Sequence, residues 1–362
     1  MTRKEFLLTV GAATATAAFQ SQNAAAQNLK KPNFKRGVTL YSYQEEYYTR
    51  AMTLEDCIAD VASMGAEGVE LIAEEMVPNY PDPPDRWVEH WHQLMDRYHT
   101  RPACLDTFVD VFWGGHRNMS VQEAVDTLAA QLKLANRMGF KVLRPTTGPV
   151  EDSAPAMIEK ALPIAEKYDV RICPEVHAPI PLKGKFIESY LEIITRTKTK
   201  HLGFNPDLGI FTRRLPRVVI DFHIRKGAHE NIARYISTAY ESNVSAADRA
   251  AAVEKMGPND IDRALLMSSG FYGPLANNPK DLLPIMPYCY NIHGKFYEMS
   301  ESLEEYSIPY AEIIPVLIEG GYAGYVNSEY EGQRNTQDAF ETDSCEQVRR
   351  HHVMMKRLMG EA

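Results

Sequence analysis

The chain lacks the cysteine spacing of a disulfide-rich or zinc-thiolate protein. Its five cysteines are odd in number and widely scattered, and they include no CxxC pair. Neither a disulfide framework nor a cysteine-ligated zinc site is therefore indicated. Cys57, Cys173 and Cys289 lie in apolar runs and are interpreted as core residues.

Positive charge is also scarce. The 362 residues include 39 Lys and Arg against 48 Asp and Glu, which gives a formal net charge of -9 at pH 7. A nucleic-acid-binding surface needs basic side chains to neutralise phosphates, so no nucleic-acid partner is expected.

Long apolar runs are missing beyond the N-terminal region, so no membrane span is expected in the mature chain. Residues 1–26 differ in kind, because Arg3 and Lys4 precede an apolar middle and the small residues Ala24 to Ala26. This pattern predicts an export signal cleaved near Ala26, and hence a periplasmic protein. The opening TRKEFL resembles a twin-arginine signal with lysine in the second position, so the choice between a Sec and a Tat-like route stays open. The alternative is an uncleaved anchor.

Strand and helix patterns alternate along the rest of the chain, residues 30–362. The segments expected to form strands are 37–43, 68–73, 101–108, 141–147, 170–177, 202–211, 288–296 and 324–331. The segments expected to form helices are 54–65, 86–98, 121–138, 154–168, 187–196, 260–267, 310–319 and 345–358. Eight strand–helix units joined by right-handed crossovers predict an α/β fold, a (β/α)8 TIM barrel.

A doubly wound open sheet is the alternative fold. It usually has a glycine-rich phosphate loop after the first strand, and the segment YSYQEEYYTR at that place contains no glycine. Residues 212–258, after the sixth strand, are long for a connection and are expected to carry helices of their own. In a barrel this insertion would lie at the C-terminal mouth, where active sites form.

Each of the last four expected strands ends with one candidate metal ligand. These residues are Glu175 in CPEVH, Asp207 in NPDLG, His293 in NIHGK and Glu329 in NSEYE. Neighbouring strands lie about 5 Å apart, so side chains that point into one mouth can surround a single ion. Three carboxylates and one imidazole form a mostly oxygen-donating set, which predicts a divalent metal, Mn²⁺ first, with Mg²⁺, Co²⁺ or Zn²⁺ as alternatives.

The order Glu, Asp, His, Glu over strands five to eight resembles the xylose isomerase-like barrel superfamily, which includes sugar phosphate isomerase/epimerases, ketose 3-epimerases and endonuclease IV-like enzymes. The resemblance implies that all four residues bind the metal. It also implies that Glu175 and Glu329 move protons on opposite sides of a bound sugar. Ketose epimerases usually carry DxxH after strand six, but the segment here is DLGI, so a plain ketose epimerase is less favoured.

Two further residues follow the ligands at a spacing of two. His177 follows Glu175, and Lys295 follows His293. The pairs E-x-H and H-x-K, together with DLGIF, are similar to the large, barrel-forming subunits of C-glycoside deglycosidases. His177 is predicted to act as a general acid or base and Lys295 to stabilise a developing oxyanion. The alternatives are a histidine that only orients Glu175 and a lysine solvated at the rim.

The leading prediction for function is a metal-dependent sugar isomerase or epimerase. A divalent ion that holds a sugar carbonyl and its neighbouring hydroxyl stabilises the enediolate formed when a base removes the proton between them. On a 3-keto-glycoside the same carbanion expels the group at C1, and the enzyme is then a lyase. The rivals are a non-catalytic sugar-binding barrel and an endonuclease IV-like phosphodiesterase. The latter needs several more histidines, whereas the first four strands end at Gln44, Glu70, Asp106 and Arg144.

Three more residues are candidates for substrate binding. Tyr41 and Tyr43 are expected to share a face of the first strand, and Arg213 follows DLGIF. The expected ligand is a small sugar or glycoside. Whether a second copy of the chain or a small second subunit completes the site stays open.

Overall fold

The computed structural model describes residues 31–109, 119–147, 153–272 and 277–361. The expected export signal, residues 1–26, lies outside this part of the chain. Within the described ranges, no helix has both the length and the apolar character needed to cross a bilayer.

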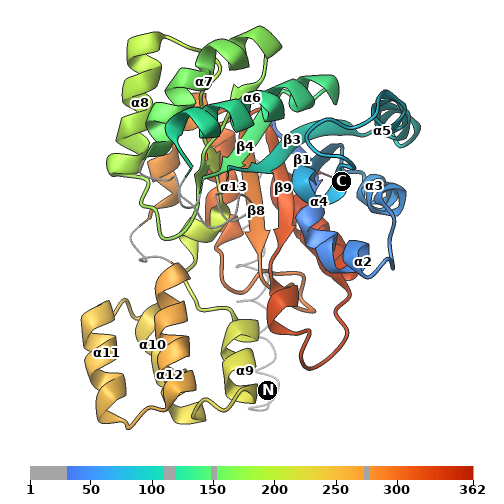
Figure 1. The fold of residues 1–362 in the computed structure, drawn as a ribbon. Coiled ribbons are helices and arrows are strands. Elements are labelled where there is room, and N and C mark those ends of the chain that lie inside the picture. Colours follow the sequence, from blue (N-terminus) through green and yellow to red (C-terminus); the bar gives the residue numbers. More distant parts are fainter. Residues whose placement is uncertain (1–30, 110–118, 148–152, 273–276, 362) are drawn as a thin grey trace, which may run out of the picture.

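A ring of parallel strands forms the centre of the molecule (Figure 1). Seven strands form one sheet in the order β5-β4-β3-β2-β1-β9-β8, and β6 pairs with β7. Parallel bridges close the ring, from Ile172 to Leu202, from Phe204 to Cys289 and from Asp207 to His293. The strands are β1 (Lys35–Thr39), β2 (Gly68–Ile72), β3 (Arg101–Phe108), β4 (Val142–Thr146), β5 (Arg171–Ile172), β6 (Glu175–Val176), β7 (Asn205–Pro206), β8 (Asn291–Phe296) and β9 (Tyr325–Tyr330). The predicted TIM barrel is confirmed.

The fifth and sixth positions of the ring are its irregular part. β5 and β6 are the two ends of one predicted strand, separated at Pro174, and β7 ends at Pro206. Proline has no N–H to donate to a ladder, which explains why regular pairing is short here. The backbone nevertheless stays in register, because the N–H of Asp207 donates to the carbonyl of Val176. Glu175 and Asp207 therefore project from neighbouring strand ends.

Helices cover the outside of the ring (Figure 1). They are α3 (Leu54–Ser63), α5 (Asp85–Arg97), α6 (Val121–Arg137), α7 (Ala154–Tyr168), α8 (Lys185–Thr197), α13 (Tyr310–Glu319) and α14 (Ser344–Met359), with the short α2 (Gln44–Tyr48) and α4 (Ala73–Met76). Capping boxes at Thr53 and Ser120 begin α3 and α6. The apolar faces of these helices and the outward side chains of the strands form one large hydrophobic core.

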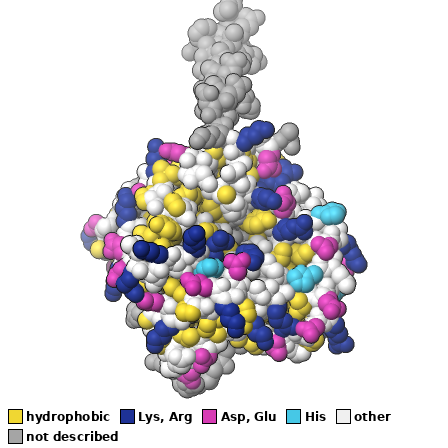
Figure 2. All heavy atoms as spheres, turned by 90° about the horizontal axis from the view of Figure 1, so that it is seen from above, with side chains coloured by type: hydrophobic (Ala, Val, Ile, Leu, Met, Phe, Trp, Pro, Cys, Tyr) yellow, Lys and Arg dark blue, Asp and Glu magenta, His cyan; other side chains and the backbone are white. Residues whose placement is uncertain are grey.

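Acidic and basic side chains are interspersed over the face seen from above in Figure 2. The described residues on this face form no continuous basic surface. This face therefore lacks the electrostatic footprint of a nucleic-acid interface.

A separate helical bundle projects from one side of the mouth (Figure 1). It consists of α9 (Arg217–Arg225), α10 (Glu230–Glu241), α11 (Ala246–Lys255) and α12 (Asp260–Ser269). The insertion was predicted to end at residue 258, with residues 260–267 covering the barrel. The structure corrects this, because Leu265 of α12 is fully buried in the core of the bundle. Short 3-10 turns, η6 (Pro279–Leu282) and η7 (Met286–Tyr288), lie between the bundle and β8 instead.

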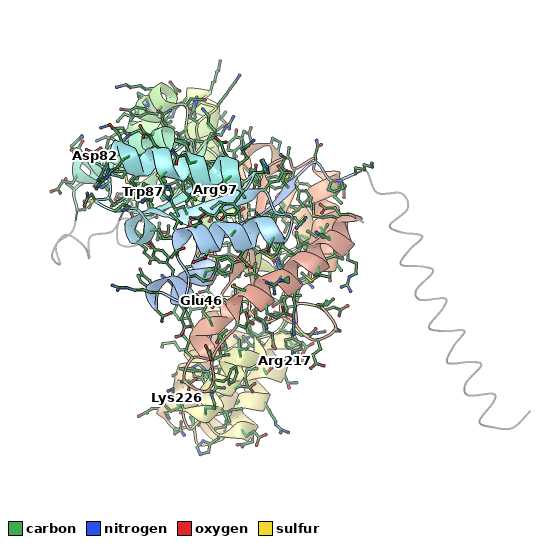
Figure 3. The ribbon with its side chains drawn as sticks, turned by 90° about the vertical axis from the view of Figure 1, so that its right-hand side faces the viewer. Glu46, Asp82, Trp87, Arg97, Arg217 and Lys226 are labelled. Carbon is green, nitrogen blue, oxygen red and sulfur yellow. The ribbon has the colours of Figure 1, made fainter. Side chains whose placement is uncertain are left out.

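Helix α9 ties the bundle to the loops that follow β8 and β9. Arg217 pairs with Glu298 at 2.7 Å, and Arg225 pairs with Asp338 at 2.8 Å. Figure 3 shows Arg217 and Lys226 where the bundle meets the C-terminal part of the chain. The bundle is thus attached to the loops next to the strand ends that carry the candidate ligands.

Candidate functional site

The interior of the barrel is polar towards the mouth. Alternate residues of a strand face the same side. In β8 the inward set is Asn291, His293 and Lys295, and in β9 it is Asn327 and Glu329, all nearly or fully buried. This interior holds ionisable groups where a TIM barrel usually packs branched apolar side chains.

The four predicted metal ligands converge in this interior. One ligand atom from each lies within 4.8 Å of the others. Nδ1 of His293 lies 2.7 Å from Oε1 of Glu175 and 3.5 Å from Oε2 of Glu329. The strands therefore bring Glu175, Asp207, His293 and Glu329 to one point, as four groups around a single ion require.

The electrostatics of this cluster fit a divalent cation. Burial, with the carboxylates of Asp207 and Glu175 adding to it, raises the pKa of Glu329 to about 7. Oε2 of Glu329 is buried and accepts no hydrogen bond from the described residues. Burial opposes the charge of His293, but the surrounding carboxylates outweigh it and hold the pKa of this imidazole well above its usual value. A cation of charge two would relieve the crowding of carboxylates and occupy the unpaired oxygen.

Lys295 lies beside the cluster and is only 4% exposed. Its Nζ atom lies 2.7 Å from Oδ2 of Asp207 and 3.3 Å from Oε2 of Glu331. Burial opposes its charge, but these carboxylates and Glu329 outweigh burial and keep the pKa of Lys295 well above its usual value. The alternative of a lysine solvated at the rim is wrong. Lys295 is a fixed positive charge in the site.

His177 presents one ring nitrogen to Lys295. Nδ1 faces the carbonyl oxygen of Ala178 at 2.5 Å, and a carbonyl only accepts, so Nδ1 carries the hydrogen. Nε2 is then unprotonated and accepts from Nζ of Lys295 at 3.2 Å. This tautomer is the one that a general base at Nε2 requires.

A cavity of about 500 Å³ opens onto the cluster. Its polar wall contains Tyr41, Glu175, His177, Lys295, Glu329 and Glu331. Its apolar wall contains Ile72, Phe108, Pro145, Ile180 and Phe186. A ligand with a hydroxyl-rich part and an apolar part fits such a cavity.

Sequence reasoning gave no role to several residues of the site. Glu331 lines the cavity and accepts from the hydroxyl of Tyr41 at 3.0 Å. Its position two residues after Glu329 was the available signal. Nη1 of Arg144 lies 3.8 Å from Oε2 of Glu175, and its Nε atom lies 3.1 Å from Oδ1 of Asp106. Glu70 contacts His293 from below the cluster.

Two predicted substrate residues lie outside this cavity. The first strand ends at Thr39, and the 3-10 helix η1 (Leu40–Tyr43) replaces its predicted continuation, so Tyr41 and Tyr43 share no strand face. Tyr43 is fully buried, and its hydroxyl donates to Asp60 at 2.7 Å. Arg213 pairs with Glu312 at 3.2 Å in a different cavity. Of the three, only Tyr41 lines the cavity at the cluster.

The sequence pattern of the xylose isomerase-like TIM barrel family matches residues 58–241. The chain belongs to this family. Within it, the chain is 30% identical over 334 residues to a C-glycoside deglycosidase alpha subunit of Arthrobacter globiformis, covering 90% of this chain and 92% of the relative. It is also 30% identical over 343 residues to the 3'-dehydrocarminate deglycosidase alpha subunit of a Microbacterium species, covering 90% of this chain and 95% of that one. Both resemblances inferred from the sequence are confirmed.

Solved structures share the family's barrel at low sequence identity. D-psicose 3-epimerase of Clostridium cellulolyticum H10 superimposes with a TM-score of 0.56 at 11% identity, covering 91% of this chain and 100% of that one. D-allulose 3-epimerase of a Methylomonas species gives a TM-score of 0.54 at 12% identity, covering 91% and 99%. At such identity the likeness concerns the fold.

Proposed function

We propose that this chain is a metal-dependent lyase that cleaves a keto-glycoside after removing the proton next to its carbonyl. The observation that carries the proposal is the pair formed by Nε2 of His177 and Nζ of Lys295, 3.2 Å apart beside the cluster of carboxylates. The deglycosidase relatives support a glycoside substrate, since they match nine-tenths of the chain. One of them is named for a 3'-dehydro compound, which supports a substrate oxidised to a ketone.

The ligand cluster supports a divalent metal, and Mn²⁺ is the proposed ion. Glu175, Asp207, His293 and Glu329 would hold it. A bound divalent ion would polarise the sugar carbonyl and the neighbouring hydroxyl. Of the four, Glu175 and Glu329 also line the cavity in which the keto-sugar would lie.

His177 takes the proton in the proposed reaction. Its Nε2 atom removes the proton from C2, next to a C3 ketone, and the C–H electron pair becomes the C2–C3 double bond of an enediolate. The charge of Lys295 stabilises the oxyanion on C3. The enediolate pair then forms the C1–C2 double bond, the carbonyl re-forms, and the C1–aglycone bond breaks with its pair on the aglycone. The aglycone takes up the proton, so the products are the free aglycone and an unsaturated keto-sugar, without an oxidant.

An isomerase or epimerase is the second candidate. Two carboxylates that line the cavity, Glu175 and Glu329, favour it, because they could deliver a proton to a different face of the enediolate. The lack of a histidine in DLGI after β7 disfavours it. The solved epimerases bear on the fold alone.

A second subunit is proposed as well. The sequence relatives are named alpha subunits, and this supports an assembly with a further chain. Co-expression with candidate small proteins and measurement of the mass of the purified particle would test it. A particle of one chain type with full activity would contradict this proposal.

The deciding experiment is an NMR assay in D₂O of the purified, Mn²⁺-loaded protein with 3-keto-glycosides and with free ketoses. Release of the aglycone with an unsaturated keto-sugar would support the lyase. Deuterium next to the carbonyl of an isomeric product would support the isomerase or epimerase. Glu175→Gln separates catalysis from binding, because a catalytic site should lose turnover while the protein still binds the sugar. No turnover of either substrate class by the wild type would leave a non-catalytic sugar-binding barrel.

A further inference from the structure

A fully buried carboxylate lies next to the cluster on the inner side of the barrel. Oε1 of Glu70, in β2, lies 2.6 Å from Nε2 of His293, and both side chains are 0% exposed. Oε2 of Glu70 accepts from the side-chain amides of Asn291, at 2.7 Å, and Asn327. A buried ion without partners costs several kcal/mol, so this carboxylate depends on its donors. Glu70 is therefore built into a specific set of hydrogen bonds.

The hydrogen bonds of Glu70 belong to a polar layer across the ring. Asn291 also donates to Oδ1 of Asn205 at 3.1 Å, and Asn327 donates to Oδ1 of Asn291 at 2.9 Å. A methyl group on Gly37 of β1 would lie 2.0 Å from Oδ1 of Asn327, so the absence of a side chain there makes room for this amide. Three strands, β7, β8 and β9, thus supply amides, and β1 supplies space, around the one carboxylate of β2.

We infer that Glu70 is a positioning residue for the metal site. Its carboxylate holds the hydrogen of His293 on Nε2 and so leaves the lone pair of Nδ1 for the ion. The carboxylate of Glu70 is held as an acceptor by the two asparagine amides, so the hydrogen between it and His293 lies on Nε2. Nδ1, on the other side of the ring, faces Glu175 and Glu329. A histidine ligand whose other nitrogen donates to a carboxylate has a fixed tautomer, a fixed ring orientation and a more basic lone pair.

This inference rests on the proposed metal site, and it assigns the orientation of His293 to one residue outside the ligand set. Asn291 and Asn327 support this role from the other side, because their amide nitrogens donate to Oε2 of Glu70, while Oε1 of Glu70 faces Nε2 of His293. Loss of the carboxylate would free the ring to rotate or to carry its hydrogen on Nδ1. Either change removes one ligand from the ion.

The test measures metal binding itself. Zn²⁺ and Mn²⁺ are titrated against a chromophoric chelator in the wild type and in Glu70→Gln, with near-ultraviolet circular dichroism as a check on folding. The dissociation constant should rise by about 10- to 100-fold in Glu70→Gln. Glu74→Gln is the control, because Glu74 is a partly buried carboxylate four residues further on that accepts from the N–H of Phe108 instead of from the polar layer. Its dissociation constant should stay within about twofold of the wild type. A folded Glu70→Gln with wild-type affinity would overturn the inference.

A second measurement does not use Glu70→Gln and so remains decisive if that variant does not fold. In Zn²⁺-loaded protein with ¹⁵N-labelled histidine rings, the His293 signal is identified by its loss in His293→Gln. The inference expects one ring hydrogen, on Nε2, and protected from exchange. A ring hydrogen on Nδ1 would overturn it. Wild-type protein that binds no divalent ion would overturn the proposed metal site together with this inference, whereas an unaffected Glu70→Gln would overturn the inference alone.

Discussion

Nζ of Lys295 lies 3.2 Å from Nε2 of His177, although the two residues are 118 positions apart in the sequence. The lysine comes from β8, and the histidine follows β6. Both line the cavity at the ligand cluster. A fixed cation and the accepting Nε2 atom of an imidazole thus meet where a bound sugar would lie.

Replacing His177 should remove most of the turnover. His177→Gln keeps a polar side chain but has no ring nitrogen to take up a proton, so kcat should fall by about 10²- to 10⁴-fold. The matched control is His201→Gln, because His201 lies before β7 and pairs with Asp169. Steady-state assays with a 3-keto-glycoside measure both. Equal kcat values in His177→Gln and the wild type would exclude His177 as the base.

Loss of the hydroxyl should affect catalysis at Tyr41 and stability at Tyr43, two positions further on. Tyr41→Phe removes a donor to Glu331 at the cavity, so KM or kcat should change by up to about tenfold with little change in stability. Tyr43→Phe removes a buried bond to Asp60, so the free energy of unfolding should fall by about 1–2 kcal/mol with unchanged KM. Urea unfolding and steady-state kinetics separate the effects. A reversed pattern would show that the substrate binds outside the cavity that Tyr41 lines.

Metal removal should lower stability. Mn²⁺ at about 100 times its dissociation constant should raise the free energy of unfolding by about 2.7 kcal/mol, and a chelator should reverse the increase. Asp207→Asn should abolish the response, because it changes a proposed ligand. Asp262→Asn should keep it, since Asp262 is buried in the separate bundle and pairs with His229. Thermal unfolding with and without Mn²⁺ measures this, and an equal response in both variants would contradict the assigned site.

Acid should destabilise the protein through two buried histidines on α14. Burial lowers the pKa of His351 to about 3 and that of His352 well below its usual value. Each group therefore contributes stability that is fully present above the unfolded pKa of about 6.5 and is lost as the pH falls from there towards the folded value. At pH 5 the loss is about 2 kcal/mol for His351.

His351→Gln isolates one of these contributions. The variant should lose about 2 kcal/mol less than the wild type between pH 7.5 and pH 5, as measured by urea unfolding at both values. Identical pH dependence in the two proteins would mean that His351 does not titrate on unfolding.

Local patterns predicted the elements well, because their causes are local. The expected helices 154–168 and 310–319 agree with α7 and α13, and the expected strand 101–108 agrees with β3. The position of helix α12 in the sequence was predicted, but the helix was expected to pack on the barrel and packs in the bundle instead. An amphipathic pattern shows that one face is buried, but not whether a barrel or a separate bundle buries Leu265.

Topology allowed the convergence of the four candidate ligands to be predicted. Once eight parallel strands are assumed, their C-terminal ends must meet, and the four residues there must be neighbours. The contact between Glu70 and His293 joins residues 223 positions apart, and it depends on side-chain direction within the ring. Tyr43 was misplaced for a related reason, because the chain leaves β1 at Thr39 and turns into η1.

The polar layer of Glu70, Asn205, Asn291 and Asn327 has a consequence for engineering. A designer who wished to make the protein more heat-resistant would first fill the barrel interior with branched apolar side chains, which usually pack there. In this barrel such changes would remove the support of His293. Improvements in heat resistance should therefore be sought in the outer helices and in the bundle of α9 to α12, which has a hydrophobic core of its own.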